Sequence, residues 1–126
     1  MELTLVPGTY AVCRLDADAP APEIASPAQF VSVTRTGDEL SIICPADAVP
    51  RGAEVQEGWR GLKVTGPLDF ALTGVAAALT SPLAAAGISV LPLATYDTDY
   101  LFVREETLAG AIGALEAAGH TVGTQS

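Results

Sequence analysis

The stretch that decides the fold is residues 60–103, RGLKVTGPLDFALTGVAAALTSPLAAAGISVLPLATYDTDYLFV. Near its start, Leu62 and Val64 alternate with polar neighbours, which predicts a strand over residues 60–68 that ends at a Gly-Pro pair. From Leu72, apolar residues recur at close to helical spacing until Gly87: Val75, Leu79, Leu83 and Ala86. This pattern predicts a helix, which Pro82 should bend or break.

Working outward from that helix, residues 88–93 predict a buried strand, residues 95–99 a polar connector and residues 100–103 a second strand. Glu105 and Glu106 suit the positive end of a following helix. The apolar face of that helix is Leu108, Ile112 and Leu115, Gly119 is its expected C-terminal cap, and residues 120–122 predict a last short strand. The predicted order is β-α-β-β-α-β, the ferredoxin-like arrangement with two helices on one face of an antiparallel sheet.

The first half of the chain has a related pattern with weaker helices. Residues 10–15, 30–35 and 40–44 predict strands, and residues 36–39 predict a hairpin turn between the last two. Proline interrupts residues 16–27, and residues 45–58 are broken by Pro and Gly, so a short helix or loop is expected in each.

The two halves align at a constant offset of 59 residues. Val31 falls on Val90, Thr36 on Thr95 and Asp38 on Asp97, and the apolar run 42–44 falls on 101–103. The agreement of strand, turn and strand predicts an internal duplication. We therefore predict an α+β fold of two tandem ferredoxin-like modules, residues 1–60 and 61–126, which must share a core or pair with a second chain because each is very small.

Composition and charge narrow the function classes. A formal charge of −9, with 15 acidic against 6 basic residues, argues against a nucleic-acid partner, because phosphate backbones require clustered Lys and Arg. No apolar run reaches the roughly 20 residues that cross a bilayer, and residues 1–4 lack the features of a signal peptide. We expect no membrane partner and a cytoplasmic location.

Cys13 and Cys44 are the two cysteines, and both lie in apolar, strand-like runs. They are expected to be reduced core residues; a disulfide has no positive support. With one histidine and no Cys-x-x-Cys motif, the sequence predicts no metal site and no cofactor.

Two segments could bind a zwitterionic ligand. An amino acid needs N–H groups for its carboxylate, such as a helix start provides, and acidic groups or carbonyls for its ammonium. Around the helix start, Asp69 is an acidic candidate, Thr73 offers a hydroxyl and Gly74 would allow close approach. Alternatively, Asp69 only caps the helix and Gly74 only packs against the sheet.

The second segment is the polar connector 95–99. Asp97 and Asp99 could hold a cation or an ammonium group there, and the alternative is an ordinary polar turn, since such residues dominate turns.

Together these segments resemble the ACT-domain family. The resemblance rests on residues 66–70, Thr73-Gly74, 81–84, 86–89 and 95–100, and residues 10–15 and 34–42 resemble small bacterial members. The most similar branch comprises tandem ACT proteins related to aspartate kinase regulatory domains and to cytosolic arginine sensors.

The resemblance implies a regulatory protein that binds an amino acid, forms a homodimer and performs no catalysis. Carried over, the ligand would lie at an interface of ACT modules between two groups of residues: Asp69, Phe70, Thr73, Gly74 and Val75 on one side, and Thr95, Tyr96, Thr98 and Asp99 on the other. Where the arginine sensors have a second acidic residue, this chain has Leu72, so the amino acid stays unspecified.

Two alternatives remain open. One is a protein interaction module without a ligand, whose partner cannot be read from the sequence; Trp59 could anchor its interface or lie in the core, which we favour. The other is a small enzyme that uses Asp97 and Asp99 as acid and base on one strand face. Against an enzyme, the chain has no Gly-x-Ser-x-Gly motif or phosphate-binding loop, and its one histidine, His120, is expected at a strand end.

Overall fold

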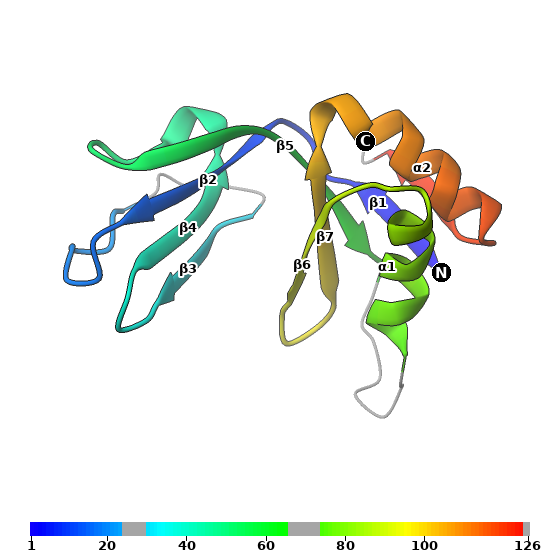
Figure 1. Cartoon of the computed structure of the whole chain (residues 1–126), viewed down its shortest axis with the longest axis horizontal. Coiled ribbons are helices and arrows are strands. Elements are labelled where there is room, and N and C mark those ends of the chain that lie inside the picture. The colour runs from blue at the N-terminus through cyan, green and yellow to red at the C-terminus, as the bar shows by residue number, and fades with distance from the viewer. Residues whose placement is uncertain (24–29, 66–73, 125–126) are drawn as a thin grey trace. The chain divides into compact units, whose positions relative to one another are not determined.

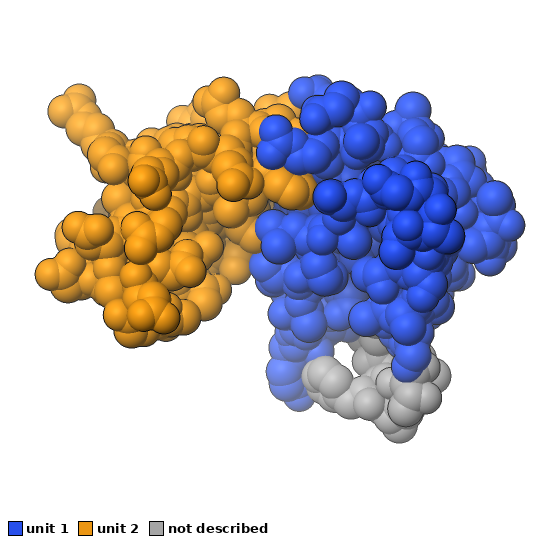
Figure 2. Space-filling model, in the orientation of Figure 1, with its two compact units in different colours: residues 1–7, 60–126 blue, residues 8–59 orange. Residues whose placement is uncertain are grey.

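A computed structural model describes residues 1–23, 30–65 and 74–124. The chain forms two compact units, coloured separately in Figure 2. Unit 1 comprises residues 1–7 and 60–126, and unit 2 comprises residues 8–59. Residues 1–7 thus belong with the second half of the chain.

The architecture of unit 1 is an open sheet with two helices. Its elements are the second part of β5 (Glu54–Val64), α1 (Val75–Ala85), β6 (Val90–Ala94), β7 (Asp99–Arg104), the 3₁₀ helix η2 (Glu105–Thr107), α2 (Leu108–Ala117), β8 (Thr121–Thr124) and β1 (Glu2–Leu5). The order β5-α1-β6-β7-α2-β8 is the predicted β-α-β-β-α-β pattern, so the predicted α+β class is confirmed.

Strand β1 was not anticipated from the sequence. It pairs antiparallel with β5 and parallel with β8, and β5 in turn pairs with β7, so β1 lies between β5 and β8 in the order β6-β7-β5-β1-β8. The run Glu2–Leu5 is too short for its alternation of apolar residues to stand out, and its partners lie far away in the sequence.

One apolar cluster forms the core of unit 1. Both helices contribute to it, which places them on the same face of the sheet (Figure 1). Its buried members come from β1, β5, α1, β7 and α2: Leu3, Leu62, Val64, Leu79, Leu83, Leu101, Val103, Ala111 and Leu115. Leu79, Leu83 and Leu115 lie on the predicted apolar faces, whereas Ala111 rather than Ile112 is the buried partner on α2.

Both helices end at glycine, as the sequence predicts. Gly87 and Gly119 have positive φ angles of 73° and 96°. Ile88 donates a backbone hydrogen bond to Leu83 (2.9 Å), and His120 donates one to Leu115 (3.0 Å), which is the Schellman closure.

The expected break at Pro82 is absent. Helix α1 runs continuously from Val75 to Ala85, with Pro82 inside it. Proline lacks one N–H and crowds the preceding turn, but here it lies in the last turn, where few bonds remain to be lost. The prediction of a break was therefore wrong, and the alternative, a bend at Pro82, stays a prediction.

The first part of β5 also differs from expectation. Residues 45–58 were predicted as a short helix or loop; the 3₁₀ helix η1 (Ala46–Ala48) fits this, but Glu54–Gly58 begins strand β5. A bulge opposite β2 (Tyr10–Leu15) explains the misreading, because the register shifts between Tyr10 and Val12. Gly58, with φ of 80°, lies in this bulge instead of ending a strand.

Unit 2 is built on β2, β3 (Ser32–Arg35), β4 (Leu40–Pro45) and the start of β5. The order β3-β4-β2-β5 is antiparallel throughout. One face buries Ala11, Cys13, Leu40, Ile42 and Cys44. Tyr10 packs edge-on against Phe30, with ring centroids 6.3 Å apart.

Both cysteines are free and buried in unit 2, as the sequence predicts. They lie on adjacent strands, where Cys13 pairs with Ile42 and Cys44 with Ala11, so the two thiols are diagonal neighbours. Burial raises the pKa of the Cys44 thiol to about 12, and the neighbouring Cys13 adds to this shift. Both thiols are therefore protonated at neutral pH and chemically quiet.

The internal duplication is visible as a shared framework. The hairpin β3–β4 and the hairpin β6–β7 have the same register at an offset of 59: Arg35 pairs with Leu40, and Ala94 with Asp99. The offset also carries η1 onto η2. Each turn is closed alike, by Thr36 N to Glu39 O (2.9 Å) and Thr95 N to Thr98 O (2.8 Å).

Strand β6 is less buried than predicted. Its residues are half-buried or exposed, because it pairs only with β7 in the described residues and so lies at an edge of the sheet. Pro92 is tolerated at such an edge, where its missing N–H is not needed. Among the described helices, none is long and apolar enough to span a membrane.

Candidate functional site

The β6–β7 turn, one of the two predicted ligand segments, is anchored to the end of β5. The Thr98 hydroxyl donates a hydrogen bond to the Val64 carbonyl oxygen (2.6 Å), and Thr98 is 5% exposed. A hydroxyl bound this way is well satisfied and fixes the position of the turn. The turn therefore lies beside the point where the chain leaves β5.

Threonine 95 shapes the same turn. Its hydroxyl donates to the Thr98 carbonyl oxygen (3.0 Å) and accepts from the Thr98 N–H (3.3 Å). Tyr96, at the tip of the turn, is 83% exposed. Thr95 and Thr98 thus shape the turn, and Tyr96 and Asp97 are exposed.

The carboxylate of Asp99 is the acidic group best placed to receive a cation. Asp99 begins β7 opposite Ala94 and is half-buried. The carboxylate of Asp99 makes no hydrogen bond or ion pair with the described residues. An ammonium group could therefore pair with Asp99 without displacing a partner of the described chain.

The start of α1 is the other predicted segment. Gly74 precedes the helix with φ of 75°, a conformation that strains any other residue, and a Cβ at this position would contact nothing within 4 Å. The glycine therefore serves the backbone turn and not close packing against the sheet. No side chain of the described residues caps this helix end, whose first N–H groups have no partner within the helix.

The two segments lie at the same end of unit 1, as Figure 1 shows for the β6–β7 turn and the beginning of α1. Val75 turns its side chain toward the core, so only its backbone is available there. Asp69, Phe70, Thr73 and the departure at Leu72 lie outside the described residues.

The groups named for an enzyme do not converge. Asp97 lies in the turn and not in β7, so it does not share a strand face with Asp99 as predicted, because β7 begins only at Asp99. His120 accepts a hydrogen bond from the N-terminal ammonium (2.8 Å) and contacts the Ala78 carbonyl oxygen (3.0 Å), which is a structural use of both ring nitrogens. No group of three or more metal-binding side chains occurs in the described ranges.

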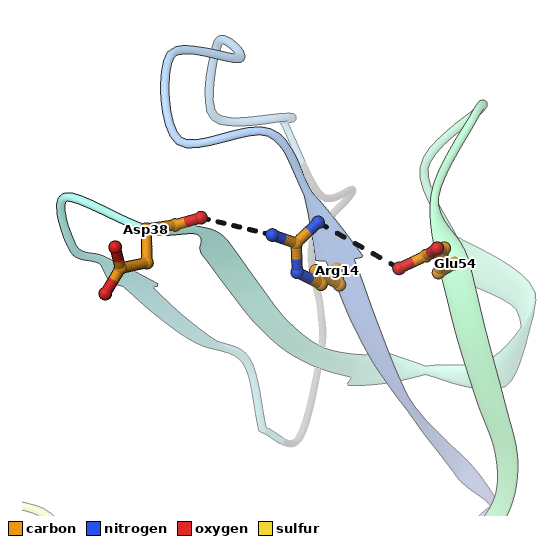
Figure 3. A network of polar contacts seen from close by, with 3 residues as sticks. All are labelled: Arg14, Asp38 and Glu54. Atoms are coloured by element: carbon orange, nitrogen blue, oxygen red, sulfur yellow. Dashed lines mark hydrogen bonds and ion pairs between the residues drawn. The ribbon is translucent and has the colours of Figure 1, made fainter.

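Unit 2 carries a separate open pocket of about 490 Å³ that sequence reasoning did not find. It lies between the end of β2, the loop after it and the start of β5, and its lining includes Arg14, Asp16, Asp18 and Glu54. Arg14 crosses this region, donating to the Asp38 carbonyl oxygen (3.1 Å) and lying 3.9 Å from the Glu54 carboxylate (Figure 3). The acidic residues that line the pocket, Asp16, Asp18 and Glu54, are exposed.

Trp59 is 8% exposed, which agrees with the preference for a core position. It pairs with Tyr10 across β2 and β5.

An open α+β sheet with two helices on one face in unit 1, and a matching hairpin framework in unit 2, defines the class to which this protein belongs. A family model described as an ACT domain matches residues 54–117, and a model of an N-terminal domain type matches residues 8–52. The chain belongs to the ACT-domain family, which confirms the resemblance seen in the sequence.

Similar solved structures share the fold. A protein from Agobacterium tumefaciens is 38% identical over 99% of this chain and 93% of its own, with a TM-score of 0.91. A protein of unknown function from Vibrio cholerae is 24% identical over 93% of this chain and 88% of its own, with a TM-score of 0.72.

The regulatory subunit of aspartate kinase from Thermus thermophilus, in its ligand-free form, shares the fold. It is 14% identical over 93% of this chain and 97% of its own, with a TM-score of 0.65. Family and fold together support a regulatory, ligand-binding type of role.

Proposed function

We propose that this protein is a non-catalytic sensor that binds a free amino acid in unit 1. The observation that carries the proposal is the position of the β6–β7 turn. Its Thr98 hydroxyl is bound to the end of β5, and the turn lies at the same end of the unit as the start of α1. A zwitterion needs both kinds of group within a few ångströms.

The ammonium of the ligand pairs with the Asp99 carboxylate. This carboxylate has no partner in the described chain and lies at the edge of the turn, within reach of solvent. The ligand carboxylate accepts hydrogen bonds from N–H groups at Gly74 and Val75, where the positive end of the helix dipole favours an anion.

The turn residues complete the site. Thr95 and Thr98 hold the turn in shape, and Tyr96 covers the ligand from the tip. Asp69, Phe70 and Thr73 belong to the proposal through the family resemblance, and Leu72 leaves the side chain of the ligand unspecified.

A thermal-shift screen against the twenty amino acids tests the proposal. At 100 times its dissociation constant, a bound ligand stabilises the folded state by about 2.7 kcal/mol. We expect at least one amino acid to raise the melting temperature and Asp99→Ala to abolish that rise.

Asp97→Ala is the matched control, because Asp97 is an exposed carboxylate two residues away on the same turn. It should keep the full response. Equal loss in both variants would show that general negative charge, and not the Asp99 site, attracts the ligand.

The second candidate is an interaction module without a ligand, and silence across the screen would favour it. The sheet edge at β3 has exposed valines at 31 and 33, which suit pairing with another chain. We propose a homodimer and a cytoplasmic location; sedimentation across a concentration series tests the first.

A further inference from the structure

Unit 2 contains a described counterpart of the proposed site. The offset of 59 carries the turn Thr95–Thr98 of unit 1 onto Thr36–Glu39 of unit 2. Strand β2 ends at Leu15, which pairs with Leu40 next to that turn, and the loop after β2 begins at Asp16. In unit 2, therefore, the loop after the first strand begins beside the hairpin turn.

Arg35 connects these two parts of unit 2. Its guanidinium donates hydrogen bonds to the Ala17 carbonyl oxygen and, at 2.7 Å, to the Ala19 carbonyl oxygen. Arg35 is the last residue of β3, immediately before the turn. A planar guanidinium with several N–H donors can satisfy two carbonyl groups at once, which an ammonium group does less well.

The corresponding residue in unit 1 has no such group. The shared register places Ala94 where unit 2 has Arg35, since Arg35 pairs with Leu40 and Ala94 with Asp99. Alanine carries no donor and ends at its Cβ. The hairpin of unit 1 therefore makes no side-chain hydrogen bond from this position, and the two units differ in whether the hairpin itself supplies a cation.

We infer that Arg35 is a built-in occupant of the unit 2 counterpart of the site. It holds a cation against the loop after β2, and Leu40 stands where unit 1 has Asp99, so that unit 2 takes up no amino acid and ligand binding is confined to unit 1. The inference rests on the proposed function, but the binding of Arg35 to the loop after β2 can be tested without a ligand in unit 1.

Tethering explains why Arg35 prevails over a free ligand. A group on the same chain meets its partners at an effective concentration in the millimolar range or above, without the loss of translational freedom that a free molecule incurs. A free amino acid would have to displace two charge-assisted hydrogen bonds before it could enter.

Chemical rescue tests the occupancy. Arg35→Ala removes the side chain beyond Cβ, and N-ethylguanidinium restores the missing atoms. In the variant, we expect this compound to shift the backbone amide NMR signals of residues 16–19 in a saturable way. In the wild-type protein these signals should stay in place.

Arg14→Ala is the matched control, because Arg14 lies at the same end of unit 2 but donates to Asp38 instead of the loop carbonyls (Figure 3). N-ethylguanidinium should leave residues 16–19 unmoved in this variant. Equal shifts in the wild type, Arg14→Ala and Arg35→Ala, or no shifts in Arg35→Ala, would overturn the inference. If Arg35→Ala does not fold, Arg35→Thr removes the same guanidinium from a strand position that suits threonine.

The same spectra separate this inference from the proposed function. When the twenty amino acids are added singly to the wild type, movement of the Val75 and Thr95–Asp99 signals supports the site in unit 1. Movement of residues 16–19 in the wild type would contradict the occupancy by Arg35, whatever happens in unit 1.

Discussion

The hairpins β3–β4 and β6–β7 share their register, turn closure and following 3₁₀ helix, yet they lie in different surroundings. In unit 1, the buried face of the hairpin packs against α1 and α2. In unit 2, the equivalent face is covered by small side chains from loops and from η1, among them Ala19, Ala48 and Ala53. The two hairpins thus have the same backbone pairing but different packing partners: helices in unit 1, and small side chains in unit 2.

The difference extends to polar groups at the two turns. In unit 1, Thr98 binds the turn to β5; its counterpart in unit 2 is the half-buried Glu39, and there Arg14 of β2 donates to the Asp38 carbonyl oxygen of the turn. In unit 2, Arg35 binds the turn region to the loop after β2, whereas its counterpart is Ala94. Each unit therefore holds its hairpin in place by a contact that the other lacks.

The largest expected effect contrasts the two cores. Leu101 and Ile42 are counterparts, 1% and 0% exposed. Leu101→Ala should lower the free energy of unfolding by about 3–5 kcal/mol and Ile42→Ala by about 2–4 kcal/mol, because side chains held by two helices close a cavity less easily. Urea denaturation measures both; a larger loss for Ile42→Ala would contradict the idea that the helices make unit 1 the more rigid core.

The next effect concerns the turn anchor. Thr98→Val removes the hydroxyl that binds Val64 and leaves a buried carbonyl oxygen without this donor, which should cost about 1–3 kcal/mol. Glu39→Val, at the equivalent position in unit 2, should change the stability by less than about 0.5 kcal/mol. Similar losses at both positions would mean that the anchor at Thr98 is not specific to unit 1.

The smallest expected effect comes from giving the core of unit 2 the residue found at the equivalent position of unit 1. Cys44 and Val103 are counterparts, and both are fully buried. Cys44→Val is close to isosteric and should change the stability near neutral pH by less than about 1.5 kcal/mol. A larger loss would show that the Cys13–Cys44 contact contributes more than its packing volume.

The same variant has a pH dependence of known sign. The pKa of Cys44 is about 12 in the folded protein and near 9.0 when the thiol is exposed in the unfolded chain. As the pH rises, the unfolded chain therefore loses this proton first. Stability should therefore fall between pH 9 and 12, and the fall should be smaller in Cys44→Val. Melting temperatures across this range measure it; identical curves for both proteins would exclude the thiol as the cause.

Much of the framework could be predicted from the sequence, and the reasons are local. Strand β2 follows directly from the run Tyr10–Leu15, and the ends of both helices follow from Gly87 and Gly119. These features depend on residues close together in the chain, whose conformational preferences leave few alternatives.

The misjudged features depend on distant partners. Gly58 ends a strand by its local preference, but in a ladder with β2 it forms a bulge. Strand β1 has no local signal, because its four residues are stabilised by pairing with β5 and β8. Pro82 interrupts a helix by its intrinsic preference, but in the last turn of α1 it removes few hydrogen bonds.

The candidate site was predictable in part. The sequence identified the turn 95–99 and the start of α1, and the structure puts both at one end of unit 1. The different uses of its residues were not predictable: nothing local distinguishes the buried, bonded hydroxyl of Thr98 from the exposed ring of Tyr96. The role of Arg35 depends on contact with a loop 16 residues earlier in the chain, which no local pattern signals.

The position of β1 has a consequence for how the protein is made. This strand is synthesised before the other described strands, but one of its two neighbours, β8 (Thr121–Thr124), is synthesised after them. Unit 2 can fold while translation continues, since all its strands lie within residues 8–59. Unit 1 must wait until residue 124 has been synthesised, so β1 lacks its β8 partner while the intervening residues are made.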